Sequence, residues 1–154
     1  MPLTDVAPIE ATIDIDAPPS VVWALVGDLR NMKRWSPQNR GTLVLGGKTE
    51  VGATFFNLNR RGPLFWPTRG KVVEVEPERR LAFRISENWT VWSFELEATE
   101  TGTRVTQRRE APQGISDLSV GLTKSVLGGI GQFTDELAQG MAKTLAGIKA
   151  DAEK

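Results

Sequence analysis

Residues 15–37 read IDAPPSVVWALVGDLRNMKRWSP, and this stretch predicts two short helices that follow directly on a strand. Proline is tolerated in the first turn of a helix, so the first helix begins at the Pro18-Pro19-Ser20 segment. Apolar residues then recur at helical spacing and form one stripe, made by Val22, Leu25, Val26 and Leu29. A second short helix is predicted over residues 30–35, and Pro37 forces the chain to leave it.

Alternating apolar and polar residues predict strands on both sides of this stretch. Before it, apolar residues alternate with polar ones between positions 9 and 15, as in a strand with one buried face. After it, strands are predicted over residues 42–45, 53–59, 66–76, 81–85, 92–98 and 103–110, with turn signals between them. The predicted order is one strand, two helices, about six antiparallel strands and a long helix, which makes the chain an α+β protein.

The C-terminal region returns to helical spacing. Its apolar residues are separated by intervals of three or four, which predicts an amphipathic helix of about 20 residues. This stripe consists of Phe133, Leu137, Met141, Thr144 and Ile148. Residues 115–130 are also compatible with a helix, and the glycines at 128, 129 and 131 interrupt it there.

The composition excludes several kinds of chemistry. The 154 residues contain no His, no Cys and no Tyr. Disulfides, thiolate nucleophiles, histidine-containing catalytic triads and histidine-containing metal sites are therefore impossible, and no metal or cofactor is expected. Any catalysis would depend on carboxylates, cations, amides, hydroxyls or water, so the composition favours a binding protein. The length fits a single domain, residues 1–154.

Charge and hydropathy narrow the partners and the location. Lys and Arg total 19, equal to the 19 Asp and Glu, and no basic block is present, so no nucleic-acid partner is expected. The first residues lack the pattern of a secretory signal. No apolar run approaches the roughly 20 residues that span a bilayer. The chain is therefore expected to be cytoplasmic and without stable membrane insertion.

The order of elements and the opening stretch resemble the START-like or SRPBCC superfamily, and within it the polyketide cyclase/dehydrase-type proteins. The matching features are Ile15-Asp16-Ala17-Pro18, Val22-Trp23, Asp28, Trp35-Ser36-Pro37, Gly52, residues 72–77 followed by Arg80-Leu81, and residues 141–145. The resemblance implies a helix-grip fold, in which a curved seven-stranded antiparallel sheet wraps around the long C-terminal helix. It also implies two short helices after strand 1 and an apolar cavity between the sheet and the C-terminal helix.

Counting outward from the last hairpin turn predicts which side chains face that cavity. With the turn centred on residues 101–102, Phe94 lies opposite Arg109 and Leu96 lies opposite Gln107, and opposite residues share a face. The face also carries Trp92, Ala98 and Val105. A lone guanidinium on a concave apolar surface is costly, so it needs a partner or a ligand.

Arg109 therefore has two alternative roles. In the first, Arg109 and the neighbouring Gln107 orient a polar or anionic group of an otherwise apolar guest. In the second, Arg109 sits near the sheet edge or pairs with a carboxylate such as Glu110 or Glu95.

The candidate wall of the cavity is largely aromatic and aliphatic. Besides Arg109 and Gln107, the candidate ligand-binding residues are Trp92, Phe94, Leu96, Phe83, Trp66, Phe133, Leu137 and Met141. Aromatic residues also dominate protein cores, so filling the core is the alternative role for most of them. Phe65 and Trp66, next to a hairpin turn, either border a pocket mouth or a partner surface or fold back under the loop.

Trp35 poses a separate question, because it follows two cations and precedes a serine–proline break. Tryptophan is rarely left exposed. In the resembling family the second helix closes one end of the cavity and its tryptophan packs into the fold. We therefore expect Trp35 to be a structural plug beneath Lys33 and Arg34, with a place on the pocket rim as the alternative.

Three functions are compatible with these features. The first is binding, with possible transport or sequestration, of a small hydrophobic ligand such as a lipid, isoprenoid or polyketide-like compound. The second is a polyketide cyclase or dehydratase that works without His or Cys, in which substrate positioning supplies much of the rate. The third is a protein-interaction or toxin-component role, with a homodimer or a protein partner using the hairpin around Trp66.

Overall fold

The structure is a computed structural model of the chain, and it describes residues 8–112 and 130–154. Seven strands form one antiparallel sheet in the order β1-β7-β6-β5-β4-β3-β2. Their bounds are β1 Ile9–Ile15, β2 Asn39–Val44, β3 Thr54–Arg61, β4 Leu64–Glu76, β5 Arg80–Ile85, β6 Val91–Ala98 and β7 Thr103–Glu110. Strands β2 to β7 are neighbours in sequence order, and the N-terminal strand β1 adds to the far side of β7.

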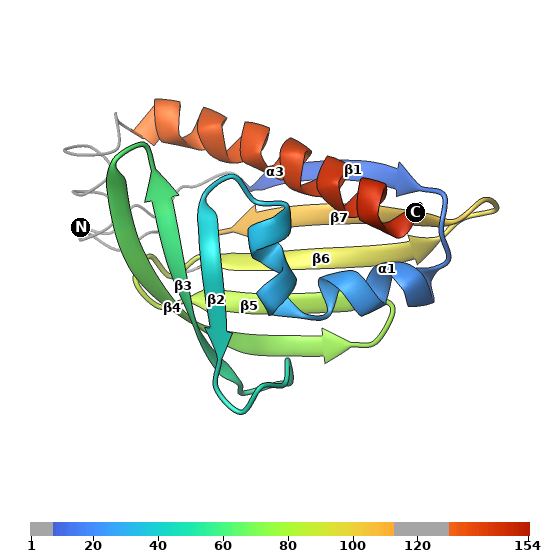
Figure 1. The fold of residues 1–154 in the computed structure, drawn as a ribbon, viewed down its shortest axis with the longest axis horizontal. Helices are drawn as coiled ribbons and strands as arrows, with labels where there is room; N and C mark the ends of the chain where they lie inside the picture. Colours follow the sequence, from blue (N-terminus) through green and yellow to red (C-terminus); the bar gives the residue numbers. More distant parts are fainter. Residues whose placement is uncertain (1–7, 113–129) are drawn as a thin grey trace.

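The helices lie on one side of the sheet. The helix α1 (Pro19–Val26) and the 3₁₀ helix η1 (Leu29–Arg34) connect β1 to β2, and the C-terminal helix α3 (Ile130–Ala152) runs along β1 and β7. Figure 1 shows the sheet curving around this side of the molecule without closing into a barrel. The predicted helix-grip fold is confirmed. The helix-compatible segment before residue 130 falls outside the described residues.

The two short helices begin and end where local chemistry requires. Pro19 opens α1 at a position that has no intrahelical N–H bond to lose. Asp28 caps η1, because its Oδ1 accepts a hydrogen bond from the Arg30 backbone N–H at 3.0 Å. The Arg30 side chain pairs with the same carboxylate and lowers the pKa of Asp28. This cap fixes the direction in which the chain continues to Trp35.

Two apolar clusters fill the end of the grip beside α1. One contains Phe94 together with Leu145 and Ile148 from the second half of α3. The other is centred on Phe55 and Phe83, whose rings meet edge to face at 5.2 Å between centroids. The residues that α3 contributes to this core therefore lie in the second half of the helix.

The predicted register of the β6–β7 hairpin is wrong by two residues. Leu96 lies opposite Val105, Phe94 opposite Gln107 and Trp92 opposite Arg109. The turn is longer than the two residues assumed, since the backbone N–H of Thr99 bonds to the carbonyl of Gly102 at 2.9 Å. An even shift keeps every side chain on its original face. Arg109 and Gln107 therefore still point to the concave side.

Among the described residues, α3 included, no helix combines the length and the apolar content needed to cross a bilayer.

Candidate ligand pocket

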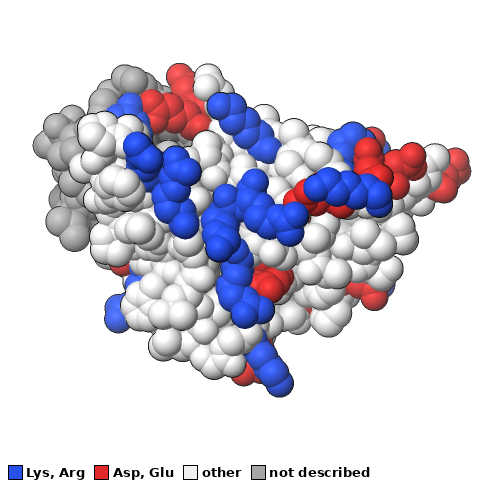
Figure 2. Space-filling view, viewed as in Figure 1, with Lys and Arg blue, Asp and Glu red and all other residues white. Residues whose placement is uncertain are grey.

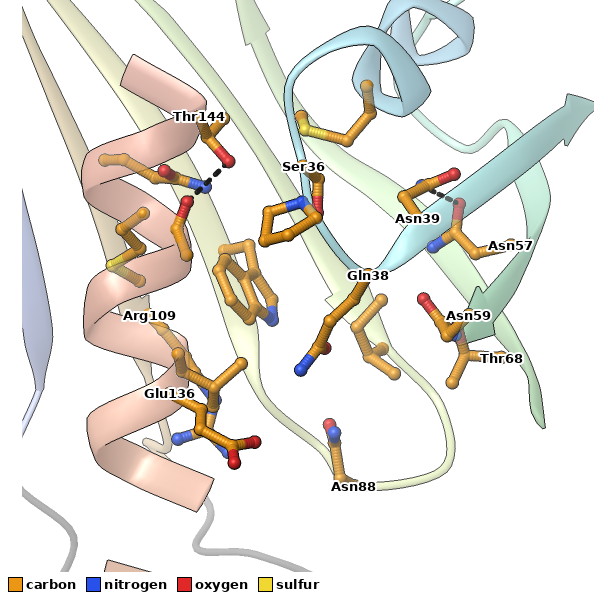
Figure 3. Close-up of a pocket in the computed structure, with 18 of the residues that line it drawn as sticks. Ser36, Gln38, Asn39, Asn57, Asn59, Thr68, Asn88, Arg109, Glu136 and Thr144 are labelled. Atoms are coloured by element: carbon orange, nitrogen blue, oxygen red, sulfur yellow. Dashed lines mark hydrogen bonds between the residues drawn. The ribbon is translucent and has the colours of Figure 1, made fainter. Parts of the chain in front are cut away.

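A cavity of about 150 Å³ lies between the first half of α3 and the concave face of the sheet (Figure 3). Residues 136–144 of α3 form one wall, and residues 36–39 approach from the η1 side. Strands β3 to β7 supply most of the remainder, together with Met32 of η1 and Asn88 between β5 and β6. A cavity of roughly this volume holds a benzene ring. The space therefore fits one ring or a short chain rather than a long lipid tail.

Arg109 is buried in this wall without a carboxylate partner among the described residues. Its exposed fraction is 8%, and it projects from β7, which lies between β1 and β6 rather than at a sheet edge. Burial lowers the pKa of Arg109 to about 10, so the guanidinium stays cationic at neutral pH. The side chain is thus a buried charge in the pocket wall.

The acids that could neutralise Arg109 are engaged elsewhere. Glu95 pairs with Arg80, and Glu110 pairs with Arg108, which removes both partners suggested by the sequence. Within the described pocket lining the acid is Glu136, and both of its carboxylate oxygens hold the Arg61 guanidinium at 2.7 Å. An ion pair therefore does not explain the burial of Arg109.

Gln107, two residues from Arg109 on the same face of β7, also has an unused polar atom. It is 4% exposed, and its Oε1 has no hydrogen-bond partner within the described part of the chain. The hydroxyl of Thr144 on α3 does not serve it, because that hydroxyl donates to the carbonyl of Gly140 at 2.8 Å. Buried polar atoms are rarely left unpaired, so this one marks a place for a guest or a water molecule.

The opposite wall is a row of carboxamides that was not among the residues predicted from the sequence. Asn57 and Asn59 project inward from β3, with Asn39 of β2 and Thr68 of β4 beside them in register. Figure 3 shows these four side chains across the cavity from Arg109, Glu136 and Thr144. The alternation of Phe55, Asn57 and Asn59 was the available signal, because it places both amides on the buried face of the strand.

The predicted ligand-binding residues separate into two groups. Seven of the ten line the cavity, namely Trp66, Phe83, Trp92, Gln107, Arg109, Leu137 and Met141. Phe94 and Leu96 belong to the core cluster beside α1 and are absent from the lining. The side chain of Phe133 lies outside the described part of α3. The wall is consequently less apolar than expected, since amides and hydroxyls replace part of the predicted aromatic surface.

The two aromatic residues near the β3–β4 turn face opposite ways. Trp66 is half-buried and lines the cavity, whereas Phe65 is 53% exposed. The guanidinium of Arg60 lies over the Phe65 ring, 5.3 Å from its centroid. Trp66 therefore borders the pocket, and Phe65 remains on the outer surface.

Trp35 is a plug, and the residues after it form the rim. Its side chain is 7% exposed and packs in the core cluster beside α1. Ser36, Pro37 and Gln38 then line the cavity. The serine–proline break thus separates a core anchor from the pocket wall.

The face that carries α1, β2 and α3 has an uneven charge. Figure 2 shows Lys and Arg side chains over much of its middle, while most visible Asp and Glu atoms lie toward its right-hand end and upper left. The charges of this face are thus unevenly distributed, although the chain as a whole has no net charge. In the described parts of the chain, no cluster of acids suits a metal ion.

Comparisons with known proteins agree with the fold. A family model described as polyketide cyclase / dehydrase and lipid transport matches residues 7–153. Protein CV1439 of Chromobacterium violaceum is 18% identical with a TM-score of 0.70, over 97% of this chain and 99% of that one. Protein BH1534 of Bacillus halodurans is 21% identical with a TM-score of 0.69, over 98% and 100%.

A third similar structure is the di-domain ARO/CYC protein BexL, which is 17% identical with a TM-score of 0.71, over 96% of this chain and 50% of that one. At these identities the likenesses show the fold alone. The chain matches no curated protein.

Proposed function

Because this chain belongs to the polyketide cyclase / dehydrase and lipid transport family, we propose that its pocket binds a small molecule with an apolar body and an anionic group. The observation that carries the proposal is Arg109, a buried cation in the cavity wall with no carboxylate partner in the described structure. Apolar side chains at Trp92, Phe83 and Met141 receive the body of the guest. Both activities in the family description handle hydrophobic small molecules, and a guest of this kind fits either.

The energy of the empty pocket favours an anionic guest. The fall in the pKa of Arg109 from its ordinary value to about 10 corresponds to about 3 kcal/mol of unfavourable free energy for the charged form in the folded protein. A bound carboxylate recovers much of that free energy through charge-assisted hydrogen bonds. Gln107 adds an amide beside the same group. A neutral guest of equal size forms no ion pair with the guanidinium and recovers less of this free energy.

The site supports binding better than turnover. General acid–base chemistry needs a group that can exchange a proton within reach of the guest, and because the chain has no His, Cys or Tyr the main candidate is a carboxyl group. The acid in the described lining, Glu136, is held by Arg61 through two short hydrogen bonds. Arg109 can polarise a carbonyl group, but the carboxylate of the described lining is already bound by Arg61. Carriage or sequestration of the guest is therefore the function we propose, in preference to cyclisation or dehydration.

Titration with matched probes tests this function. We expect benzoate to bind at least about tenfold more tightly than benzyl alcohol, because a hydrogen bond to a charged group contributes about 1.5–3 kcal/mol. Fluorescence of the pocket tryptophans reports binding, and Arg109→Met should erase the difference. Arg104→Met is the matched control, since Arg104 pairs with Asp14 on the exposed face. Equal affinity for the two probes, or an equal effect of both variants, would contradict the proposal.

A further inference from the structure

The carboxamide row across the pocket from Arg109 indicates which polar group the guest carries at the end opposite its anionic group. Its hydrogen bonds fix which amide atoms remain unused. Asn39 Oδ1 accepts from the backbone N–H of Gly41 at 2.8 Å, so Asn39 Nδ2 must be the end that reaches Asn57 at 3.4 Å. Asn57 meets it with Oδ1, which also accepts from the Thr42 hydroxyl at 2.7 Å. The Nδ2 group of Asn57 is left as a donor without a partner among the described residues.

The hydrogen bonds of Asn59 also fix the orientation of its amide, but here the nitrogen is used and the oxygen is left over. Its Nδ2 donates to the carbonyl of Trp66 at 3.3 Å and to the hydroxyl of Thr68 at 3.0 Å. A backbone carbonyl can only accept, so the amide cannot be turned around. Asn59 Oδ1 is left as an acceptor without a described partner. One strand face therefore presents an unused donor and an unused acceptor on two side chains whose Cα atoms are about 7 Å apart along the strand.

A hydroxyl group matches this pair, because it accepts one hydrogen bond and donates another. A methyl or ether group at the same place offers Asn59 Oδ1 no donor, so the guest loses that hydrogen bond. Arg109 lies on β7 and Asn57 on β3, four strand-to-strand steps apart. At about 4.8 Å per step they are at most roughly 19 Å apart along the sheet, and less across its curved face. The long arginine side chain covers part of that span.

We propose that the guest is a one-ring carboxylate with a hydroxyl group at the end opposite its carboxylate. This inference rests on the proposed function, which assigns the carboxylate to Arg109. The cavity volume of about 150 Å³ limits the body between the two polar ends to about one ring. The hydroxyl sits between Asn57 Nδ2 and Asn59 Oδ1, and it distinguishes this guest from plain aryl carboxylates.

Three probes and two leucine variants test the inference. Isothermal titration would compare 4-hydroxybenzoate, benzoate and 4-hydroxybenzyl alcohol on the full chain. We expect 4-hydroxybenzoate to bind about tenfold or more tightly than benzoate, the gain expected from one or two hydrogen bonds. Asn57→Leu and Asn59→Leu should each remove most of that preference while benzoate still binds, which also shows that the variant folds. Asn31→Leu is the control, since Asn31 bonds to the Leu25 carbonyl away from the cavity.

The possible failures point to different conclusions. Equal affinity for 4-hydroxybenzoate and benzoate overturns the hydroxyl assignment and leaves the anion site standing. A preference that survives both leucine variants has the same meaning. If 4-hydroxybenzyl alcohol binds as tightly as 4-hydroxybenzoate, or if neither carboxylate binds, the proposed function fails and this inference fails with it.

Discussion

The indole N–H of Trp35 donates to Asp151 Oδ2 across 2.7 Å and joins the end of η1 to the last turn of α3. Arg34 pairs with the same oxygen at 3.2 Å, and the side chain of Asp151 is 14% exposed. The Trp35 hydrogen bond is the largest cause that lowers the pKa of Asp151. Trp35, which follows two cations in the sequence, thus links the end of η1 to the C-terminal helix α3.

Replacing this indole should cost stability in a pH-dependent way. Trp35→Phe removes the donor and leaves a small void, so we expect about 2 kcal/mol less unfolding free energy at pH 7. The lowered pKa of Asp151 contributes stability that is present above its unfolded value near 3.9 and is lost as the pH falls through its folded value. The difference between wild type and variant should therefore shrink near pH 3. Urea titrations at both pH values measure it, and a pH-independent difference would contradict the role of the hydrogen bond.

Two glycines on α3 provide a matched pair. A Cβ on Gly147 would lie 2.8 Å from Trp35 Cδ1, whereas a Cβ on Gly140 would meet its nearest neighbour, Pro37 Cγ, at 3.5 Å. Alanine gains about 1 kcal/mol over glycine in helix propensity at either position. We expect Gly140→Ala to raise the melting temperature by about 2–4 °C. Gly147→Ala should lower it, because overpacking against the anchored indole costs about 1–3 kcal/mol. The same sign at both positions would mean that Trp35 is not fixed.

Much of this architecture could be predicted from the sequence because it depends on periodicity. The alternation in β1 and β5 and the stripe of α3 predicted these elements. β1 has its predicted bounds, β5 begins one residue earlier than predicted, and α3 extends beyond the stripe at both ends. The face of Arg109 was also predictable, since a strand side chain has two possible directions and an even error in register preserves the direction.

The remaining details depend on contacts that periodicity does not encode. The loop between β6 and β7 is closed by Thr99, whose hydroxyl accepts from the Gly102 N–H at 3.0 Å, and this lengthened turn moved the register. A register shift between Asn39 and Gly41 on β2 places the Asn39 amide in the carboxamide row, and such irregularities leave no periodic trace. Phe94 and Leu96 share a face with Arg109, yet the second half of α3 covers them. Whether a residue on this face lines the pocket or joins the core depends on its position along the strand. The alternation of the sequence predicts the face but does not show where α3 covers it.

The Arg61–Glu136 pair should hold the pocket wall with a measurable but modest free energy. Its two side chains are 29% and 32% exposed, and the pair links the end of β3 to the first half of α3. Glu136→Gln should lower the melting temperature slightly at low salt and by less in 1 M NaCl. Asp14→Asn is the control, because the Arg104–Asp14 pair is 49% and 67% exposed. Thermal melts at two salt concentrations measure both, and equal losses for the two variants would contradict a structural role for Glu136.

Removing the buried charge at position 109 should stabilise the empty protein while it weakens binding. Arg109→Met keeps an unbranched apolar stem in the wall and deletes the uncompensated guanidinium, so we expect a gain of about 1–3 kcal/mol in unfolding free energy at pH 7. The sign follows from the pKa. Because burial lowers the pKa of Arg109 to about 10, the unfolded chain binds more protons than the folded protein above about pH 10, and wild-type stability recovers as the pH rises further. The stability advantage of the methionine variant should therefore be full below pH 10 and shrink above it.

The affinity of the wild-type protein for benzoate should fall over the same rise in pH, because the cationic form of Arg109 is lost. Urea titrations at pH 7 and pH 10.5, paired with benzoate titrations, measure both effects. A variant less stable than wild type at pH 7 would show that Arg109 supports the fold rather than a guest.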